Sequence, residues 1–246
     1  MNLYYRLLLS SLIPLVAFYL LSQFQISLLL EDTRRRVEQN IDKQIDIVRE
    51  NLDDQIDDLE YIADLLAHSE EIVFSVENRD NDNLTRWGRH FLGEKVDLIL
   101  FTDLQGTVLA RPHNEFHFAD SVATMPYFKA LDRESQYLGV AALNGSKAIV
   151  YATTIRKYEE IPVGYLVAGS YLDRVLIDRL TFNTDLSLAF DFNGYSVNNM
   201  HSRSVMETRD LDSRIAGNFK IRVQIYADKH SLKLEDLRFR ETAIAG

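Results

Sequence analysis

The side chains best suited to metal binding or acid–base chemistry fall in one short run, His113-x-x-x-His117-x-x-Asp120. On a helix this spacing would place the three groups on one side. Pro112 and the polar and aromatic residues within the run instead favour a loop, in which the spacing carries little information. We therefore predict no metal site here, and a hydrolase built on these three residues is the weakest of our hypotheses.

Sequence motifs that would identify an enzyme are absent from the chain. There is no Gly-x-Ser-x-Gly nucleophile elbow, no phosphate-binding loop and no His-Glu-x-x-His motif. Cysteine is also absent, which excludes disulfides, thiolate metal sites and cysteine nucleophiles. The formal net charge of -10 argues against nucleic-acid binding, because no basic surplus exists to displace counterions from phosphates. We expect no catalytic residue and no cofactor.

Residues 7–30 form an uncharged, mostly apolar run that is long enough to cross a membrane, which takes roughly 20 residues. No Ala-x-Ala-like cleavage site follows, so an uncleaved anchor is favoured over a signal peptide. Arg34, Arg35 and Arg36 follow the run and only Arg6 precedes it, so the positive-inside rule would place the large domain in the cytoplasm. The character of that domain, described below, favours the opposite orientation.

Residues 37–66 repeat with a heptad period and contain neither glycine nor proline, which predicts a helix of about 45 Å. The stripe could pair with its twin in a homodimer, with Gln55 fixing the register, or pack on its own domain. We expect a mixture, with a dimer seam near the membrane and domain packing from about Leu59 onward. The two seam positions hold Ile41, Val48, Gln55 and Ile62, and Ile45, Leu52, Leu59 and Leu66.

The chain between residues 96 and 180 alternates between β-rich runs and turns. A loop over residues 112–125 leads into a short helix that begins at Pro126, and residues 173–180 predict a closing helix. This order predicts an α+β fold, in which a PAS-like antiparallel sheet follows a long helix and carries a helix inserted on one side. The predicted strands are 96–103, 107–111, 136–143, 147–157 and 163–171.

A weaker copy of one motif follows this region. The pattern of apolar strand, Asp-x-amide-Gly turn and second strand at residues 98–109 recurs at residues 186–197. We interpret it as a smaller, reduced second PAS-like lobe, with its last strand at 219–227. The predicted organisation is a transmembrane helix (7–30), a long amphipathic helix (31–70), a membrane-distal lobe (71–182), a small membrane-proximal lobe (183–230) and an exit helix (231–246) towards a second membrane span.

In its element order and local motifs the chain resembles the double-Cache family of extracytoplasmic sensor domains of bacterial transmembrane receptors. The motifs are the Asp103–Gly106 turn, the Pro126–Leu131 helix start, the segment Gly145–Tyr151 and the strand Val163–Val167. The distal lobe is similar to that of dicarboxylate-type sensor kinases, although Met125 stands where those have an arginine. CHASE-type sensor domains share the architecture and are the alternative classification.

The resemblance implies a ligand pocket between the loop before the short helix, the helix start and the central strands. Lys147 would meet a carboxylate or phosphate as a point charge, and the tyrosines would offer an apolar wall and a hydroxyl. The alternative is that the tyrosines are core residues and Lys147 is solvated. The residues assigned to the pocket are Tyr127, Tyr137, Lys147, Tyr151 and Thr153, with Arg111 and His113 at its mouth.

The resemblance further implies an inner-membrane protein whose soluble domain lies in the periplasm and binds a small organic ligand, an organic acid or an amino acid. The chain would be the sensing region of a histidine kinase, a cyclic-dinucleotide enzyme or a chemoreceptor, and would signal through its helices. The alternative is a membrane-anchored protein-interaction or scaffold module without a small-molecule ligand. Apolar side chains closing the space between Tyr127 and Tyr151 would favour the alternative, and an open polar cavity would favour the sensor.

Overall fold

The computed structural model divides the chain into two units, Met1–Asp46 and Ile47–Gly246. Within them it describes residues 3–93, 95–131, 133–143, 145–184, 186–192, 195–198, 205–211, 213–215 and 219–226. The expected exit helix at 231–246 lies outside these ranges.

The first unit is the N-terminal part of one long helix, α1 (Leu3–Ala67). In the described part of the chain, α1 is the one helix that is long and apolar enough to cross a membrane. Leu15, Phe18 and Phe24 are each more than 60% exposed, as side chains that face lipid would be. The apolar run predicted from the sequence is therefore a continuous helix.

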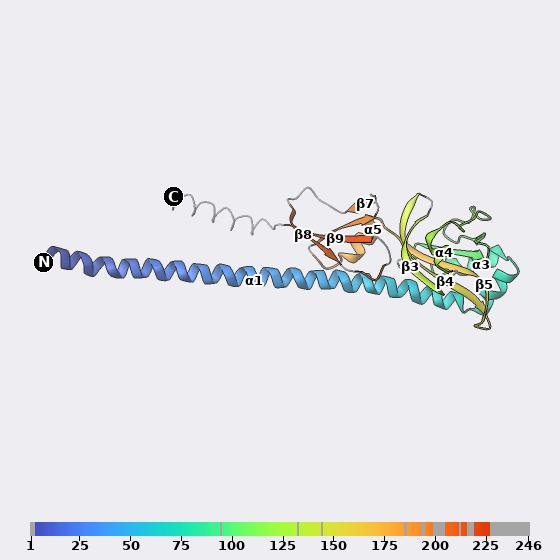
Figure 1. Cartoon of the computed structure of the whole chain (residues 1–246), viewed down its shortest axis with the longest axis horizontal. Helices are drawn as coiled ribbons and strands as arrows, with labels where there is room; N and C mark the ends of the chain where they lie inside the picture. The colour runs from blue at the N-terminus through green and yellow to red at the C-terminus, as the bar shows by residue number, and fades with distance from the viewer. Residues whose placement is uncertain are drawn as a thin grey trace. The chain divides into compact units, whose positions relative to one another are not determined.

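The second unit begins with the remaining turns of α1, which pack on the domain that follows (Figure 1). Val48, Leu52 and Leu59 are fully buried, so the predicted onset of domain packing near Leu59 is wrong, because the stripe is already covered at Val48. Gln55 donates through Nε2 to the carbonyl of Lys95 (2.5 Å) and to Ser170 Oγ (3.1 Å). It therefore ties the helix to the sheet and does not set the register of a dimer.

A five-stranded antiparallel sheet in the order β2-β1-β5-β4-β3 forms the centre of this unit. One of its faces packs on α1, and the other on α4 (Pro126–Leu131) and the loop before it. This arrangement confirms the predicted α+β class with a PAS-like sheet. The strands are β1 (Leu98–Asp103), β2 (Val108–Ala110), β3 (Gln136–Leu143), β4 (Ser146–Lys157) and β5 (Ile161–Tyr171).

Two short helices, α2 (Glu70–Glu77) and α3 (Asn81–Arg89), connect α1 to the sheet. The Asp80 side chain caps α3 by accepting a hydrogen bond from the amide of Asn83 at 3.0 Å. The helix α2 buries Ile72, Val73 and Val76 and exposes its glutamates, so only one side of it faces the domain. The sequence patterns had predicted neither helix.

A second antiparallel sheet, in the order β7-β6-β9-β8, follows helix α5 (Arg174–Leu180). Its side chains Leu188, Phe190 and Ile221 are fully buried, and Val223 is 1% exposed. The predicted hairpin at 186–197 corresponds to the first two of these strands, whereas β8 was not expected from the sequence. The strands are β6 (Ser187–Phe192), β7 (Tyr195–Asn198), β8 (Val205–Leu211) and β9 (Phe219–Tyr226).

Candidate ligand site

The five-stranded sheet separates the residues that the sequence had assigned to one pocket. Successive side chains of a strand point to opposite faces. In β4, Val150 and Ala152 belong to the core under α4, so Tyr151 and Thr153 point to the face that α1 covers. Tyr151 Oη lies 3.4 Å from Asp64 Oδ1 of α1. The proposed grouping of Tyr151 and Thr153 with Tyr127 in one pocket is therefore wrong.

Lys147 lies on the same face as Tyr151 by the strand alternation and is half-buried near the start of β4. Burial and the nearby carboxylates of Asp64 and Glu60 raise the pKa of Tyr151 well above its ordinary value. Its phenol is therefore neutral at every physiological pH. On this face the tyrosine acts as a polar contact between the sheet and α1.

Arg111 is the most deeply buried cation among the predicted site residues, with 5% of its surface exposed. Its Nη1 and Nη2 donate to the two carboxylate oxygens of Asp120, both at 2.7 Å, and Nη1 also donates to the carbonyl of His117 at 3.1 Å. This two-pronged geometry is the strongest kind of arginine–carboxylate contact. The Asp120 side chain is itself 53% exposed, so the pair joins a buried cation to a surface loop.

The hydrogen bonds from Arg111 are the main reason why the pKa of Asp120 lies below its ordinary value. They also close the loop that runs from Arg111 to Asp120, and Arg89 of α3 forms an ion pair with Glu115 in the same loop. The loop thus has two charged tethers. At the inner end of the loop the carbonyl of Asp120 also accepts a hydrogen bond from the amide of Val108 in β2 at 2.8 Å, so this end stays attached to β2 when the Asp120 side chain leaves Arg111.

Tyr127, in the first turn of α4, carries a buried hydroxyl that has no hydrogen-bond partner among the described residues. The residue is 1% exposed, and burial raises its pKa strongly, while the charge of Arg111 lowers it and that of Asp120 raises it again. Leaving such a group unpaired costs about 1–3 kcal/mol, so its retention calls for a reason. We call Arg111, Asp120 and Tyr127 the Arg111 cluster.

The rest of this sheet face is packed with apolar side chains from β1, β3, β4, β5 and α4. Tyr137 packs against this core, and a Cβ on Gly139 would lie 2.2 Å from its hydroxyl, so the glycine makes room for the ring. Burial raises the pKa of Tyr137. Tyr171 joins the same core at the end of β5, and burial raises its pKa as well. The Arg111 cluster is thus a polar group beside an apolar core.

His113 has a structural contact. Its Nδ1 lies 2.9 Å from the carbonyl of Ile99, a position on β1 that has no partner in β2. Burial lowers its pKa, which keeps the imidazole neutral at pH 7. Within the described ranges, no three His, Cys, Asp or Glu side chains are placed to hold a metal ion.

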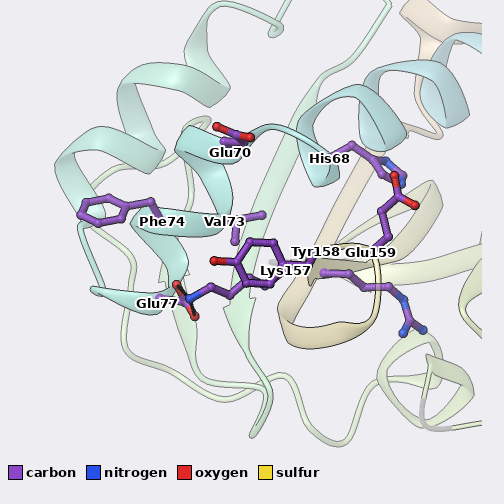
Figure 2. Close-up of a pocket in the computed structure, with 9 residues that line it drawn as sticks. His68, Glu70, Val73, Phe74, Glu77, Lys157, Tyr158 and Glu159 are labelled. Atoms are coloured by element: carbon purple, nitrogen blue, oxygen red, sulfur yellow. Dashed lines mark hydrogen bonds and ion pairs between the residues drawn. The ribbon is translucent and has the colours of Figure 1, made fainter.

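A cleft of about 500 Å³ that the sequence did not indicate lies between α2 and the turn joining β4 to β5 (Figure 2). None of the predicted site residues lines it. The signal that could have pointed to it is the glutamate pair at the start of α2 together with the turn residues Tyr158 and Glu159. The residues that line the cleft are His68, Glu70, Val73, Phe74, Glu77, Arg156, Lys157, Tyr158 and Glu159. We call it the α2 cleft.

Residues 51–191 match the sequence model of the CHASE4 domain, and the chain belongs to the CHASE4 domain family. The predicted resemblance to sensor domains is thereby confirmed. Of the two classifications, the family model that matches is of the CHASE type, the alternative predicted from the sequence. No curated protein sequence matches the chain.

Solved structures of sensor domains share the fold. The periplasmic domain of Vibrio cholerae LuxQ is 13% identical, with a TM-score of 0.54 over 75% of this chain and 97% of that chain. The sensor domain of the V. cholerae histidine kinase DctB is 12% identical, with a TM-score of 0.54 over 79% and 99%. The ligand-binding domain of the Pseudomonas fluorescens chemoreceptor CtaA, solved with L-serine, is 14% identical, with a TM-score of 0.53 over 80% and 100%.

Proposed function

We propose that the chain is the extracytoplasmic sensing region of a bacterial membrane signal-transduction receptor, anchored in the inner membrane by the N-terminal part of α1. Its membership of the CHASE4 family supports this role, as does the fold that it shares with sensor domains of a histidine kinase and a chemoreceptor. The apolar, exposed helix near the N-terminus supports the anchor. The output of the receptor would be a kinase, a cyclic-dinucleotide enzyme or a chemotaxis module.

The ligand site that we propose is the Arg111 cluster, and the observation that carries it is the buried, unpaired hydroxyl of Tyr127. A small organic acid or amino acid would bring a carboxylate that replaces the Asp120 carboxylate on the buried fork of Arg111. The same ligand would accept a hydrogen bond from Tyr127, which would pair the unsatisfied group. L-Serine in the CtaA structure is an example of such a ligand on this fold.

This site also supplies a way to signal. The Asp120 side chain is the inner charged tether of the loop that follows β2, so displacing it removes one of the contacts that hold the loop. A ligand shifts an equilibrium only as far as it prefers one arrangement over the other. We propose that the ligand prefers the arrangement in which Asp120 has left Arg111.

A thermal-shift screen of the full chain in neutral detergent tests the proposal. The standard L-amino acids and short mono- and dicarboxylic acids are the probes, and their amides and esters are the controls. We expect at least one free acid to raise the melting temperature, and its amide to fail, because only the acid offers a carboxylate to Arg111. If all free acids behave like their amides, the carboxylate assignment is wrong.

A homodimer through α1 remains a proposal, and fewer residues of the helix are available for it than the heptad pattern suggested. The heptad stripe from Val48 to Leu66 is buried against the chain's own domain and cannot face a twin at the same time. The seam that remains for a dimer is residues 37–44, because Ile45 is already buried. The predicted lobe boundaries at residues 71–182 and 183–230 likewise stay proposals.

The second candidate function is a membrane-anchored protein-interaction module without a small-molecule ligand. The apolar packing that fills most of the α4 face of the sheet favours it, because that packing surrounds Tyr127 with side chains. The space between Tyr127 and Tyr151 cannot distinguish a sensor from an interaction module, because the sheet lies between the two residues. The screen described above separates the two candidates.

A further inference from the structure

The α2 cleft combines an open cavity with large apolar side chains around it. Tyr158 in the turn is 81% exposed, Phe74 of α2 is 65% exposed, and Ile161 at the start of β5 is 55% exposed. Phe74 and Tyr158 both belong to the lining of the cleft (Figure 2). Aromatic residues exposed at the edge of a cleft are typical of protein-binding anchors. The apolar surface is therefore wider than the cavity itself.

The turn that bears Tyr158 has an unusual backbone. The amide of Glu160 donates to the carbonyl of Lys157 at 3.3 Å, and the two central residues, Tyr158 and Glu159, have φ values of 52° and 64°. Such turns normally carry asparagine and glycine, since left-handed φ disfavours bulky side chains. The sequence thus keeps an aromatic ring and a carboxylate where the backbone alone would select other residues. Strain of this kind often marks a functional surface.

The charge of the surface is negative. The lining of the cleft contains three glutamates (Glu70, Glu77 and Glu159) against two basic residues, Arg156 and Lys157. Lys157 is held by Glu77, with its Nζ at 2.8 Å from both carboxylate oxygens. The same ammonium lies 5.6 Å from the centre of the Tyr158 ring, so the ring already accepts a cation on one face.

From these features we infer that the α2 cleft is a docking surface for a partner protein that presents a basic segment, with arginine or lysine flanked by apolar residues. Glu70 and Glu159 would pair with the basic side chains, while Tyr158 and Phe74 would contact the cations and their apolar neighbours. A protein fits better than a free small cation, because Ile161 extends the apolar contact beyond the cavity. The surface shares no residue with the Arg111 cluster and does not depend on the sensing proposal.

The test uses the full chain in neutral detergent and two synthetic peptides, one alternating leucine with arginine and the other alternating leucine with glutamate. Fluorescence anisotropy measures binding at low and high salt. The variants are Tyr158→Asn and the double substitution Glu70→Gln with Glu159→Gln. Tyr61→Asn is the matched control, since Tyr61 is a 67% exposed tyrosine of α1 that does not line the cleft.

We expect the arginine peptide to bind, the glutamate peptide to fail, and high salt to weaken the binding. Tyr158→Asn should weaken the arginine peptide about tenfold, as the loss of an aromatic anchor does. The same variant should raise the melting temperature by about 3 °C, because asparagine tolerates left-handed φ. Unfolding therefore cannot explain the loss of binding. The double glutamine variant should also bind more weakly, and Tyr61→Asn should bind like the unchanged protein.

Equal binding of both peptides, or unchanged binding after Tyr158→Asn, would overturn the inference. Spermidine competes in a further arm of the experiment. If it displaces the peptide at concentrations equal to the peptide's own dissociation constant, the occupant is a free small cation and the assignment to a protein is wrong.

Discussion

At the scale of single residues, the face of the sheet to which a side chain points decides which of the predicted site residues can share one pocket. The residue types were informative, since Arg111 and Tyr127 both prove to be buried polar groups. Their grouping with Tyr151 and Thr153 failed because strand alternation alone does not say which face α4 covers. The pairing of Arg111 with Asp120 also could not be read from the sequence, because it depends on the path of the loop.

The unpaired hydroxyl of Tyr127 makes a prediction about stability. Tyr127→Phe removes only the oxygen and leaves the buried ring in place. We expect the free energy of unfolding to rise by about 1 kcal/mol, because an unsatisfied buried group disappears. Urea unfolding of the two proteins measures the difference. A loss of stability would show that the hydroxyl has a partner in solution.

The pair of Asp120 with Arg111 makes a prediction about pH. The folded-state pKa of Asp120 lies below its ordinary value of 3.8, so its stabilisation is present above that value and is lost as pH falls through the folded pKa. Below about pH 4 the melting temperature of the unchanged protein should therefore fall more steeply than that of Asp120→Asn. Parallel curves in a pH series of thermal melts would contradict the assignment.

At the scale of elements, the strands of the large sheet and the long helix could be predicted because their periodicities are extended and clear. The helices α2 and α3 could not, since each spans fewer than ten residues, which is too short for a clear helical periodicity. The heptad pattern predicted the helix but not its partner. A period of 3.5 residues is satisfied equally by a twin helix and by a domain's own sheet.

The packing of α1 on its own domain can be separated from pairing in a dimer. Leu52→Ala removes a fully buried side chain from the stripe and should cost about 2–5 kcal/mol of unfolding free energy. Because the contact lies within one chain, the loss should be the same at low and high protein concentration. Tyr61→Ala, on the exposed side of the same helix, is the control and should change stability little. A loss that shrinks as protein concentration rises would place Leu52 in a dimer interface.

At the scale of the whole molecule, two features predict opposite orientations in the membrane. The three arginines after the apolar run favour a cytoplasmic domain, whereas the resemblance of the domain to sensor domains favours an extracytoplasmic one. Family membership supports the extracytoplasmic orientation, and the absence of cysteine in the described chain makes it simple to test. Phe116 is 92% exposed in the loop after β2. A Phe116→Cys variant should react with a membrane-impermeant maleimide in cells whose outer membrane has been permeabilised. Labelling that requires lysis of the inner membrane would place the domain in the cytoplasm.

The central claim is that a small carboxylate ligand binds at the Arg111 cluster in competition with Asp120, and isothermal titration of the free acid that raises the melting temperature most tests it directly. The account predicts changes of opposite sign in two variants. Asp120→Asn should tighten binding by about tenfold, because the competing charge on Arg111 is gone. Tyr127→Phe should weaken binding by about tenfold, because the ligand loses a buried hydrogen bond. Equal affinities in all three proteins would contradict the account.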